Sequence, residues 1–178
     1  LTKIEWPPSA STSDDFAKYP CHIVQKEDGL CPLDLNPAED YIVRNELAKN
    51  RTVAFYRNPS GSMSAKAFSI PYMSSVGRKA LHPDFLFFVK DGDGTIKPSI
   101  VDPHGDFLSD TLAKLRGYVA YLREYPDVFK QVLFVGDMGG GVYKVLNLLR
   151  ADVQDAVMGY SDVDCKALFY SSYANDYQ

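Results

Sequence analysis

The sequence has few cysteines and no long hydrophobic run. Cys21, Cys31 and Cys165 are an odd and sparse set, which argues against a disulfide framework and indicates reduced thiols. No apolar run approaches the roughly 20 residues that span a bilayer, and the N-terminus lacks the basic and then apolar pattern of a secretion signal. We therefore expect a cytoplasmic protein with no membrane partner.

The sequence also lacks an excess of basic residues and a complete set of zinc ligands. The formal net charge of −4 argues against a protein that binds nucleic acid through a broad basic surface. A nuclease is not excluded, since a metal site itself concentrates acidic residues. Cys21, His22 and Cys31 supply three zinc ligands, but no second CxxC or HxxxH pair completes a set of four. A zinc site stays a minor alternative.

The sequence contains enough apolar residues to form one substantial hydrophobic core. Apolar residues make up 46% of its 178 residues and aromatic residues 13%, which predicts a single folded domain. The stretch Trp6–Asp15 is rich in Pro, Ser and Asp, so we interpret residues 1–20 as a linker and residues 21–178 as the domain. Because the chain begins at Leu1 rather than at a methionine, we expect a segment of a longer protein.

The pattern of residues predicts a helix, several strands, a second helix and a further strand. Asn36–Glu39 combines a capping Asn, a Pro at the first helical position and a Glu three residues after the cap, which predicts a helix that runs to about Lys49. Apolar residues spaced by three and four predict an amphipathic helix over 108–124. Strands are expected over residues 52–56, 67–72, 84–89, 96–102, 131–135 and 143–148, and closing helices over 152–158 and 162–170.

Only one long helix lies between two strands, and this limits the fold. Such an order allows at most one parallel crossover, so we expect an α/β fold with a mixed central sheet flanked by helices rather than a doubly wound sheet. The turn Gly136–Gly141 is similar to a phosphate-binding loop but matches neither G-x-G-x-x-G nor G-x-x-x-x-G-K-[ST]. A hairpin accounts better for this turn, and a nucleotide-binding domain stays a weaker alternative.

Two acids flank the apolar strands of a predicted hairpin between His82 and Gly105. Asp84 precedes one strand, Asp102 ends the next, and Lys90–Thr95 between them is dense in turn residues, so pairing brings the two acids into one neighbourhood. An acid beside a buried strand needs a compensating cation or donor. Convergent carboxylates that hold a divalent metal can activate a water and neutralise charge on a phosphate. The hairpin therefore predicts a metal-dependent phosphodiesterase, although each acid alone is also typical of a strand end.

Two further side chains are candidates for catalysis. His104 lies two residues beyond Asp102, so in an extended strand both side chains emerge on the same face, where an imidazole can orient water or stabilise charge. A histidine bonded within its own turn is an equally good interpretation. Lys114 belongs to the polar edge of the 108–124 helix, with Asp110, Tyr118 and Tyr121. It either pairs with Asp110 at the surface or leans over the site.

A third acid and several cations remain ambiguous from the pattern alone. Glu39 is already explained as a capping residue, and Glu46 lies seven residues on, on nearly the same helical face. Either one, or neither, reaches the metal. Arg57 follows a strand and offers a planar fork suited to a DNA phosphate, whereas point charges come from Lys66, Arg78 and Lys79. Most such cations are simply solvated.

A resemblance to a known family is carried by four segments in order, which are Phe55–Pro59, His82–Leu86, Val101–Asp106 and Leu112–Gly117. They span much of residues 39–135, and residues 166–170 are also similar. Together these segments resemble the PD-(D/E)XK nuclease superfamily. More narrowly, the chain is similar to the C-terminal domain that follows the motor in type III restriction subunit-like DEAD/DEAH-box helicases of bacteria.

The resemblance implies a restriction-endonuclease-like α/β fold and a magnesium-dependent DNA endonuclease. Glu39, Asp84 and Asp102 would be the metal-binding acids, with Mg²⁺ or Mn²⁺ as the cofactor. The implied partners are DNA and a helicase motor, in bacterial defence against foreign DNA. His104 stands where the superfamily has a lysine, and a neutral imidazole cannot replace a fixed charge. The alternative is therefore a catalytically inactive nuclease fold that binds DNA or docks to the helicase.

Overall fold

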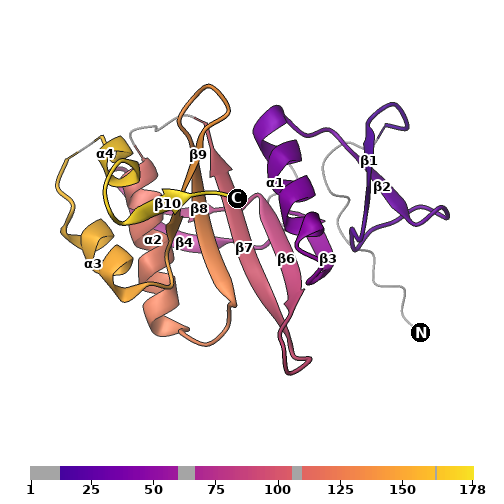
Figure 1. The fold of residues 1–178 in the computed structure, drawn as a ribbon. Helices are drawn as coiled ribbons and strands as arrows, with labels where there is room; N and C mark the ends of the chain where they lie inside the picture. Colours follow the sequence, from indigo (N-terminus) through magenta and orange to yellow (C-terminus); the bar gives the residue numbers. More distant parts are fainter. Residues whose placement is uncertain (1–12, 60–66, 106–109, 163) are drawn as a thin grey trace.

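A six-stranded mixed sheet forms the centre of the described part of the chain (Figure 1). The computed structural model describes residues 13–59, 67–105, 110–162 and 164–178. The sheet has the order β10-β9-β8-β7-β6-β3. Its strands are β3 (Thr52–Arg57), β6 (Phe85–Lys90), β7 (Ile96–His104), β8 (Gln131–Asp137), β9 (Tyr143–Asn147) and β10 (Ala174–Asp176).

One parallel pair distinguishes this sheet from a simple meander. β7 and β8 run parallel, whereas the other neighbouring strands of the sheet are antiparallel. The crossover between β7 and β8 contains α2 (Thr111–Glu124), as a parallel connection requires. The predictions of a mixed sheet and of at most one parallel crossover are confirmed.

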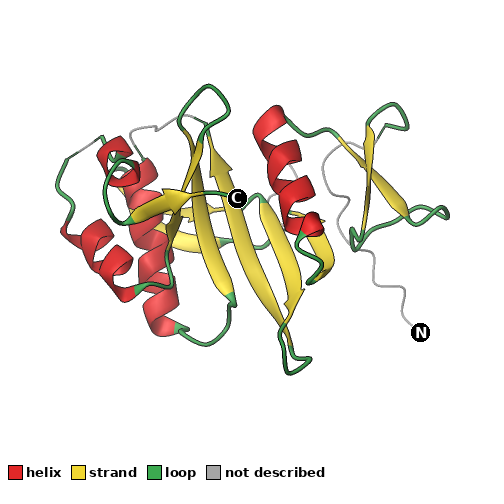
Figure 2. Ribbon diagram, viewed as in Figure 1, coloured by secondary structure: helices red, strands yellow, loops and turns green. Residues whose placement is uncertain are grey.

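Helices cover both faces of the sheet, so each face builds its own core (Figure 2). α1 (Pro37–Ala48) packs on one face, with a separate hairpin of β1 (Ala17–Pro20) and β2 (Leu30–Leu33) beyond it. The other face carries α2, α3 (Ala151–Gly159) and α4 (Lys166–Phe169), with the hairpin of β4 (Ile70–Ser74) and β5 (Gly77–Leu81). Successive residues of β7 point to opposite faces: Ile100 belongs to the α2 core and Val101 to the α1 core.

The first helix begins where the capping pattern predicts. The Asn36 side-chain oxygen accepts the Glu39 N–H at 3.0 Å, and the Glu39 carboxylate accepts the Asn36 N–H at 2.9 Å. Pro37 occupies the first helical position and Lys49 is the C-terminal cap. Because reciprocal capping satisfies two otherwise unpaired N–H groups, this helix needed no tertiary information to be predicted.

Two expected elements differ from the structure, and one strand was not expected. The strand expected at 67–72 begins only at Ile70, because both backbone groups of Phe68 bond to the Asn58 side chain. The strand β5 was not expected, since four of its five residues are not buried. The helix expected at 162–170 shortens to α4 because the carboxylates of Asp162 and Asp164 accept backbone N–H groups two residues on, a turn geometry that competes with helix.

The boundary of the N-terminal linker is also corrected. Residues 1–12 lie outside the described residues, as do 106–109 at the expected start of α2 and 60–66 with Lys66. Residues 17–20, expected in the linker, instead form β1, which pairs antiparallel with β2. Tyr19 is buried in the α1 core, and its hydroxyl donates to Asp40 of α1 at 2.5 Å. A folded segment therefore extends before residue 21. No helix in the described part is long and apolar enough to cross a membrane.

Close packing of α2 on β4 depends on a glycine. A Cβ placed on Gly117 would collide with the Cβ of Tyr72. We therefore expect Gly117→Ala to lower the free energy of unfolding by about 1–3 kcal/mol, the usual cost of overpacking, as measured by urea denaturation. Gly159 is the matched control, because a Cβ there meets nothing within 4 Å. Equal stabilities of the Gly117 and Gly159 variants would contradict this account.

Candidate active site

The two strand-flanking acids meet at one end of the β6–β7 hairpin. The strands pair antiparallel, with Phe85 opposite Val101, and the turn between them is closed by hydrogen bonds between Asp91 and Thr95 and between Gly94 and Asp91. The backbone N–H of Asp84 donates to Oδ1 of Asp102 at 2.9 Å. The predicted hairpin, and the prediction that Asp84 and Asp102 share one neighbourhood, are confirmed.

Asp102 is a buried anion held by three donors. Its side chain is only 6% exposed. Oδ1 accepts the Asp84 N–H, and Oδ2 accepts hydrogen bonds from His104 Nε2 at 3.0 Å and the Tyr118 hydroxyl at 2.8 Å. Burial opposes ionisation, but His104 and the three hydrogen bonds outweigh it, so the pKa of Asp102 is lowered. Asp102 is therefore ionised at neutral pH and fixed in orientation.

His104 projects onto the same face as Asp102, as the two-residue spacing predicts. Its ring stacks on Phe134 of β8, with centroids 4.1 Å apart and planes inclined by 14°. Burial lowers the pKa of His104, but the charges of Asp102 and Asp84 outweigh this and raise it overall. The imidazole is thus biased toward its cationic form in the position where the resemblance has a lysine.

Arg57 lies between two carboxylates rather than open to solvent. Its Nη2 is 2.5 Å from Oε1 of Glu39, and its Nη1 is 2.7 Å from Oδ1 of Asp84. The Arg57 side chain is 12% exposed and that of Glu39 7%. The guanidinium of Arg57 thus forms two ion pairs in the structure, and its contact with a DNA phosphate stays a prediction. Lys66, the other expected phosphate ligand, lies outside the described residues.

The choice between the two glutamates of α1 depends on where α1 meets the sheet. Glu39 faces Arg57, beside Asp84. Glu46 instead accepts hydrogen bonds from the Tyr177 hydroxyl and from Lys49, both at 2.7 Å. The C-terminal Tyr177 is buried against it. Glu39 is therefore the glutamate of the site, and Glu46 anchors the C-terminus.

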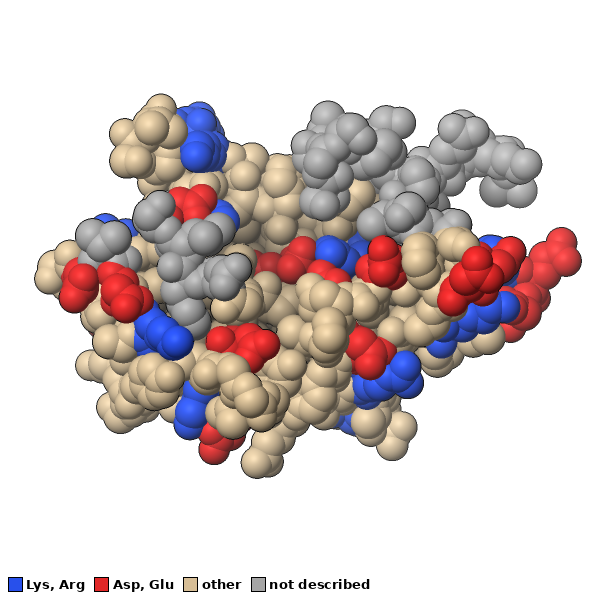
Figure 3. All heavy atoms as spheres, turned by 90° about the horizontal axis from the view of Figure 1, so that it is seen from above, with Lys and Arg blue, Asp and Glu red and all other residues tan. Residues whose placement is uncertain are grey.

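Asp84 carries the excess negative charge of the cluster. Burial raises its pKa to about 6, with further raising by Asp102 and Glu39, while Arg57 lowers it. Its side chain is 28% exposed. Within the described residues Oδ2 of Asp84 receives no hydrogen bond, so one carboxylate oxygen remains open to a ligand. In the view from above, acidic and basic side chains lie next to each other near the centre of the molecule (Figure 3).

Lys114 and Tyr118 approach the site from α2. The Nζ of Lys114 is 3.3 Å from Oδ1 of Asp110, so the expected ion pair is present. Its charge also lowers the pKa of His104. Tyr118 was expected on the polar edge of the helix but is buried, with its pKa raised well above the usual value by burial and by Asp102. The Tyr118 hydroxyl donates to Asp102, which lies on the sheet behind α2.

Two alternatives lose their basis in the structure. His22 uses both ring nitrogens, since Nε2 accepts the Arg57 N–H at 3.1 Å and Nδ1 lies 2.8 Å from the Val24 carbonyl oxygen. It therefore positions Arg57 rather than a zinc ion. The turn at Gly139–Gly141 joins β8 and β9 as a hairpin, with Met138 N–H bonded to the Val142 carbonyl at 2.9 Å. A nucleotide-binding loop followed by a helix is absent there.

The carboxylates of Asp84 and Asp102 are the candidate magnesium ligands of this site. Among the described residues, no group of three or more His, Cys, Asp or Glu side chains is arranged to hold a metal. Mg²⁺ commonly uses one or two carboxylates together with water and phosphate oxygens. Asp84 and Asp102 supply such hard oxygen donors, and the pKa of Asp84 is raised first by burial and then by the charge of Asp102. Glu39, expected as a third ligand, is instead bound to Arg57.

Comparison with known proteins identifies relatives but no activity. Residues 20–178 match the sequence model of the YagJ family. Protein YagJ of Escherichia coli strain K12 is 34% identical over 164 residues, which cover 92% of this chain and 65% of the relative. The chain thus spans about two-thirds of the length of this curated relative. No solved structure matches significantly.

Proposed function

The chain belongs to the YagJ family, and we propose that it is a metal-dependent endonuclease domain that hydrolyses DNA phosphodiester bonds. The observation that carries this proposal is the joint position of Asp84, Asp102 and His104 at the end of one hairpin. A buried carboxylate, a partly exposed carboxylate with a free oxygen and an imidazole form a set suited to hydrolysis at a phosphate. We also propose that this site is of the PD-(D/E)XK type and that the sheet which carries it is restriction-endonuclease-like.

Each residue of the site has a role that follows from its contacts. Asp84 and Asp102 would hold the metal, which when bound supplies Lewis-acid stabilisation of charge on the phosphate and a more acidic water. His104, oriented by Asp102 and by the ring of Phe134, positions the attacking water or donates to a phosphate oxygen. Lys114 adds a second positive charge beside it. Tyr118 fixes the orientation of Asp102.

Arg57 and Glu39 form the outer part of the site. Arg57 neutralises Glu39 and part of the charge on Asp84, so Glu39 supports the metal-binding acids through the guanidinium. Because a divalent ion would compete with Arg57 for Asp84, Arg57 would then be free to turn toward a DNA phosphate. This retains for Arg57 the phosphate-binding role that its fork geometry suits.

The setting of the activity follows from the resemblance to helicase-associated nucleases. We propose that the domain works in the bacterial cytoplasm, covalently linked to or associated with an ATP-dependent helicase, in defence against foreign DNA. The segments Phe55–Pro59, His82–Leu86 and Val101–Asp106 support this setting. In this arrangement the motor brings DNA to the site, which explains how a chain with a net charge of −4 acts on a polyanion.

One observation favours the alternative of a catalytically inactive module. Both oxygens of Asp102 already accept hydrogen bonds, and Arg57 already neutralises Glu39 and Asp84. Because the charged groups of the site already bind one another, the site needs no metal ion for its stability. An inactive domain of this kind would bind DNA or dock to the helicase.

Metal titration separates the active domain from the inactive module. Calorimetric titration of the wild-type chain with Mn²⁺ should show saturable binding with a stoichiometry near one, and binding should be lost in Asp102→Asn, which removes a ligand charge. Circular dichroism checks that the variant is folded, and Asp84→Asn provides a second variant at a more exposed position. Saturable binding that both variants retain, or no saturable binding in the wild type, would contradict the proposed metal site.

A further inference from the structure

The β4–β5 hairpin exposes apolar and basic side chains together. Of the large apolar side chains that the described residues expose, Val76 at 80% and Met73 at 69% are the two most exposed. Met73 pairs across the hairpin with Arg78, and Tyr72 with Lys79. Arg78 and Lys79 are exposed. Isolated exposed apolar residues are ordinary, but two at one hairpin tip beside two cations form a surface suited to a partner.

The turn end of the β4–β5 hairpin has a fixed position, because the rest of the hairpin is packed into the domain. The turn is closed by the Ser74 hydroxyl, which donates to the Gly77 carbonyl at 2.8 Å. The opposite side of the hairpin is buried in the α2 core through Ile70, Tyr72 and Leu81. The Tyr72 hydroxyl also donates to Asp110 at the start of α2 at 3.1 Å. The hairpin is therefore a rigid arm of the domain.

The two cations of the arm have no acidic partner. Neither Arg78 nor Lys79 forms an ion pair within the described residues, whereas Lys114 and Arg57 are both paired. The charge of Lys79 does lower the pKa of Asp110, so Lys79 faces the beginning of α2. The two cations stand on opposite faces of β5, with Arg78 beside Met73 on the outer face and Lys79 toward α2. Each can therefore meet a different backbone phosphate, and DNA binding gains chiefly from neutralised phosphates.

The arm leads directly into the proposed catalytic site. β5 ends at Leu81, and Asp84 follows three residues later. At roughly 3.5 Å per extended residue, Lys79 lies at most about 17 Å along the chain from Asp84. A DNA strand that rises about 3.4 Å per nucleotide covers this span in about five nucleotides. A strand bound at Asp84 is therefore long enough to reach the arm.

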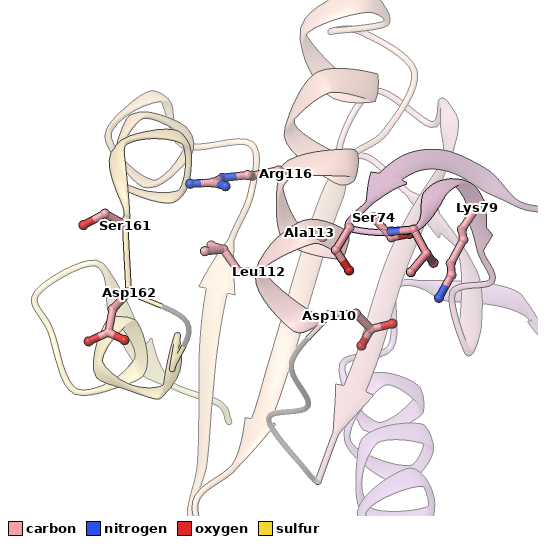
Figure 4. Close-up of a pocket in the computed structure, with 10 residues that line it drawn as sticks. Ser74, Lys79, Asp110, Leu112, Ala113, Arg116, Ser161 and Asp162 are labelled. Atoms are coloured by element: carbon pink, nitrogen blue, oxygen red, sulfur yellow. The ribbon is translucent and has the colours of Figure 1, made fainter.

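A pocket joins the arm to α2 and extends the same surface. It has a volume of about 630 Å³ and lies between the β4–β5 turn, the first turns of α2 and residues 161–162 (Figure 4). The side chains of Lys79 and Arg116 stand on its two sides, Ser74 and Ser161 add hydroxyl groups, and the carboxylates of Asp110 and Asp162 also line it. Arg116 already donates to the Tyr160 carbonyl oxygen, so Lys79 and the serine hydroxyls are the groups of this lining that suit a DNA backbone phosphate.

We propose that the β4–β5 hairpin is the DNA-docking arm of this domain and that its partner is double-stranded DNA. Arg78 and Lys79 bind backbone phosphates a few nucleotides from the cleaved bond. Met73 and Val76 press against the groove, as apolar side chains do in proteins that wedge into DNA. This inference rests on the proposed function, because DNA is the substrate in both.

The test is the binding of a labelled DNA duplex of 20 base pairs in EDTA, so that no cleavage occurs. The variant Arg78→Gln with Lys79→Gln should bind at least tenfold more weakly than the wild type at 50 mM salt. The slope of log affinity against log salt should fall in magnitude by about 1.8, which corresponds to two lost phosphate contacts. Met73→Ser with Val76→Ser should weaken binding severalfold without changing the slope.

The matched control is Lys90→Gln with Lys97→Gln, at the turn end of the β6–β7 hairpin, far along β6 from Asp84. This control removes the same charge and should leave affinity and slope unchanged. If the arm variants bind like the wild type, the arm is not a DNA surface, and its apolar tip would then suit a protein partner. If the wild type binds DNA but does not cleave it, and the arm variants bind DNA more weakly, the DNA-docking role of the arm is supported. Only the proposed nuclease activity is then contradicted. If the wild-type chain does not bind the duplex, the docking role of the arm and the proposed nuclease function are both contradicted.

Discussion

Replacing Asp84 by asparagine is expected to slow Mg²⁺-dependent DNA cleavage by roughly two to three orders of magnitude, the loss typical when a group that stabilises transition-state charge is removed. Asp84 offers the carboxylate oxygen that is open to a ligand. The substitution keeps the shape of the side chain and its ability to accept from Arg57 but removes the charge. Single-turnover cleavage of a supercoiled plasmid measures the effect.

The same substitution should leave the domain as stable as the wild type or more stable. Burial and the neighbouring Asp102 raise the pKa of Asp84 to about 6, so the folded state resists its ionisation. A neutral asparagine avoids the cost of a buried negative charge at this position. A gain in stability with a loss of activity is typical of a functional site. Unfolding of Asp84→Asn below the wild-type midpoint would contradict this interpretation.

Asp91 gives a matched control for Asp84. It follows β6 at the opposite end, pairs with Lys130 at 2.6 Å, and its side chain is 23% exposed, close to the 28% of Asp84. Asp91→Asn removes the same charge beside the other end of β6 and should change the cleavage rate less than about twofold, since a surface pair contributes little. Equal losses in the Asp84 and Asp91 variants would remove Asp84 from the site.

Replacing Arg57 by methionine is expected to have the largest effect on stability. Glu39 and Asp84 would lose the cation that neutralises them, and removing one partner of a buried ion pair costs about 3–5 kcal/mol. Chemical denaturation at pH 7 measures this loss. The control is Arg44→Met, because the Arg44 side chain is 63% exposed in its pair with Asp40 and such pairs contribute about 1 kcal/mol or less.

The pH dependence of the Arg57 variant identifies the cause of its loss. The pKa of Asp84 is 3.8 before perturbation and about 6 in the folded chain, so the folded state binds more protons between these values and stability falls as pH rises through them. Without Arg57 the folded pKa rises further, so the deficit of the variant should be smaller at pH 5 than at pH 8. A deficit independent of pH would indicate lost packing instead.

Local signals in the sequence account for the parts that were predicted. The capping pattern of Asn36 and Glu39 defines α1, and the turn residues between Lys90 and Thr95 define the β6–β7 hairpin. These signals depend on neighbours in the chain, so they need no tertiary context. Because the hairpin fixes the register, the meeting of Asp84 and Asp102 was predicted with it.

The partners of the site residues could not be predicted, because they come from distant parts of the chain. Arg57 was interpreted as a phosphate ligand, yet it is bound by Glu39 of α1 and by Asp84. Tyr118 looked like a surface residue of an amphipathic helix, but Asp102 on the sheet behind it gives its hydroxyl a buried acceptor. Side-chain pattern alone shows a helical face, not what packs against it.

The most direct test of the proposed activity is incubation of the wild-type chain with supercoiled and linear DNA in Mg²⁺, in Mn²⁺ and in EDTA. The proposed site predicts nicked and then linear products with either metal, none in EDTA, and none with Asp84→Asn under the same conditions. If the folded wild-type chain leaves both forms of DNA intact with both metals, the site of Asp84, Asp102 and His104 is not a nuclease centre.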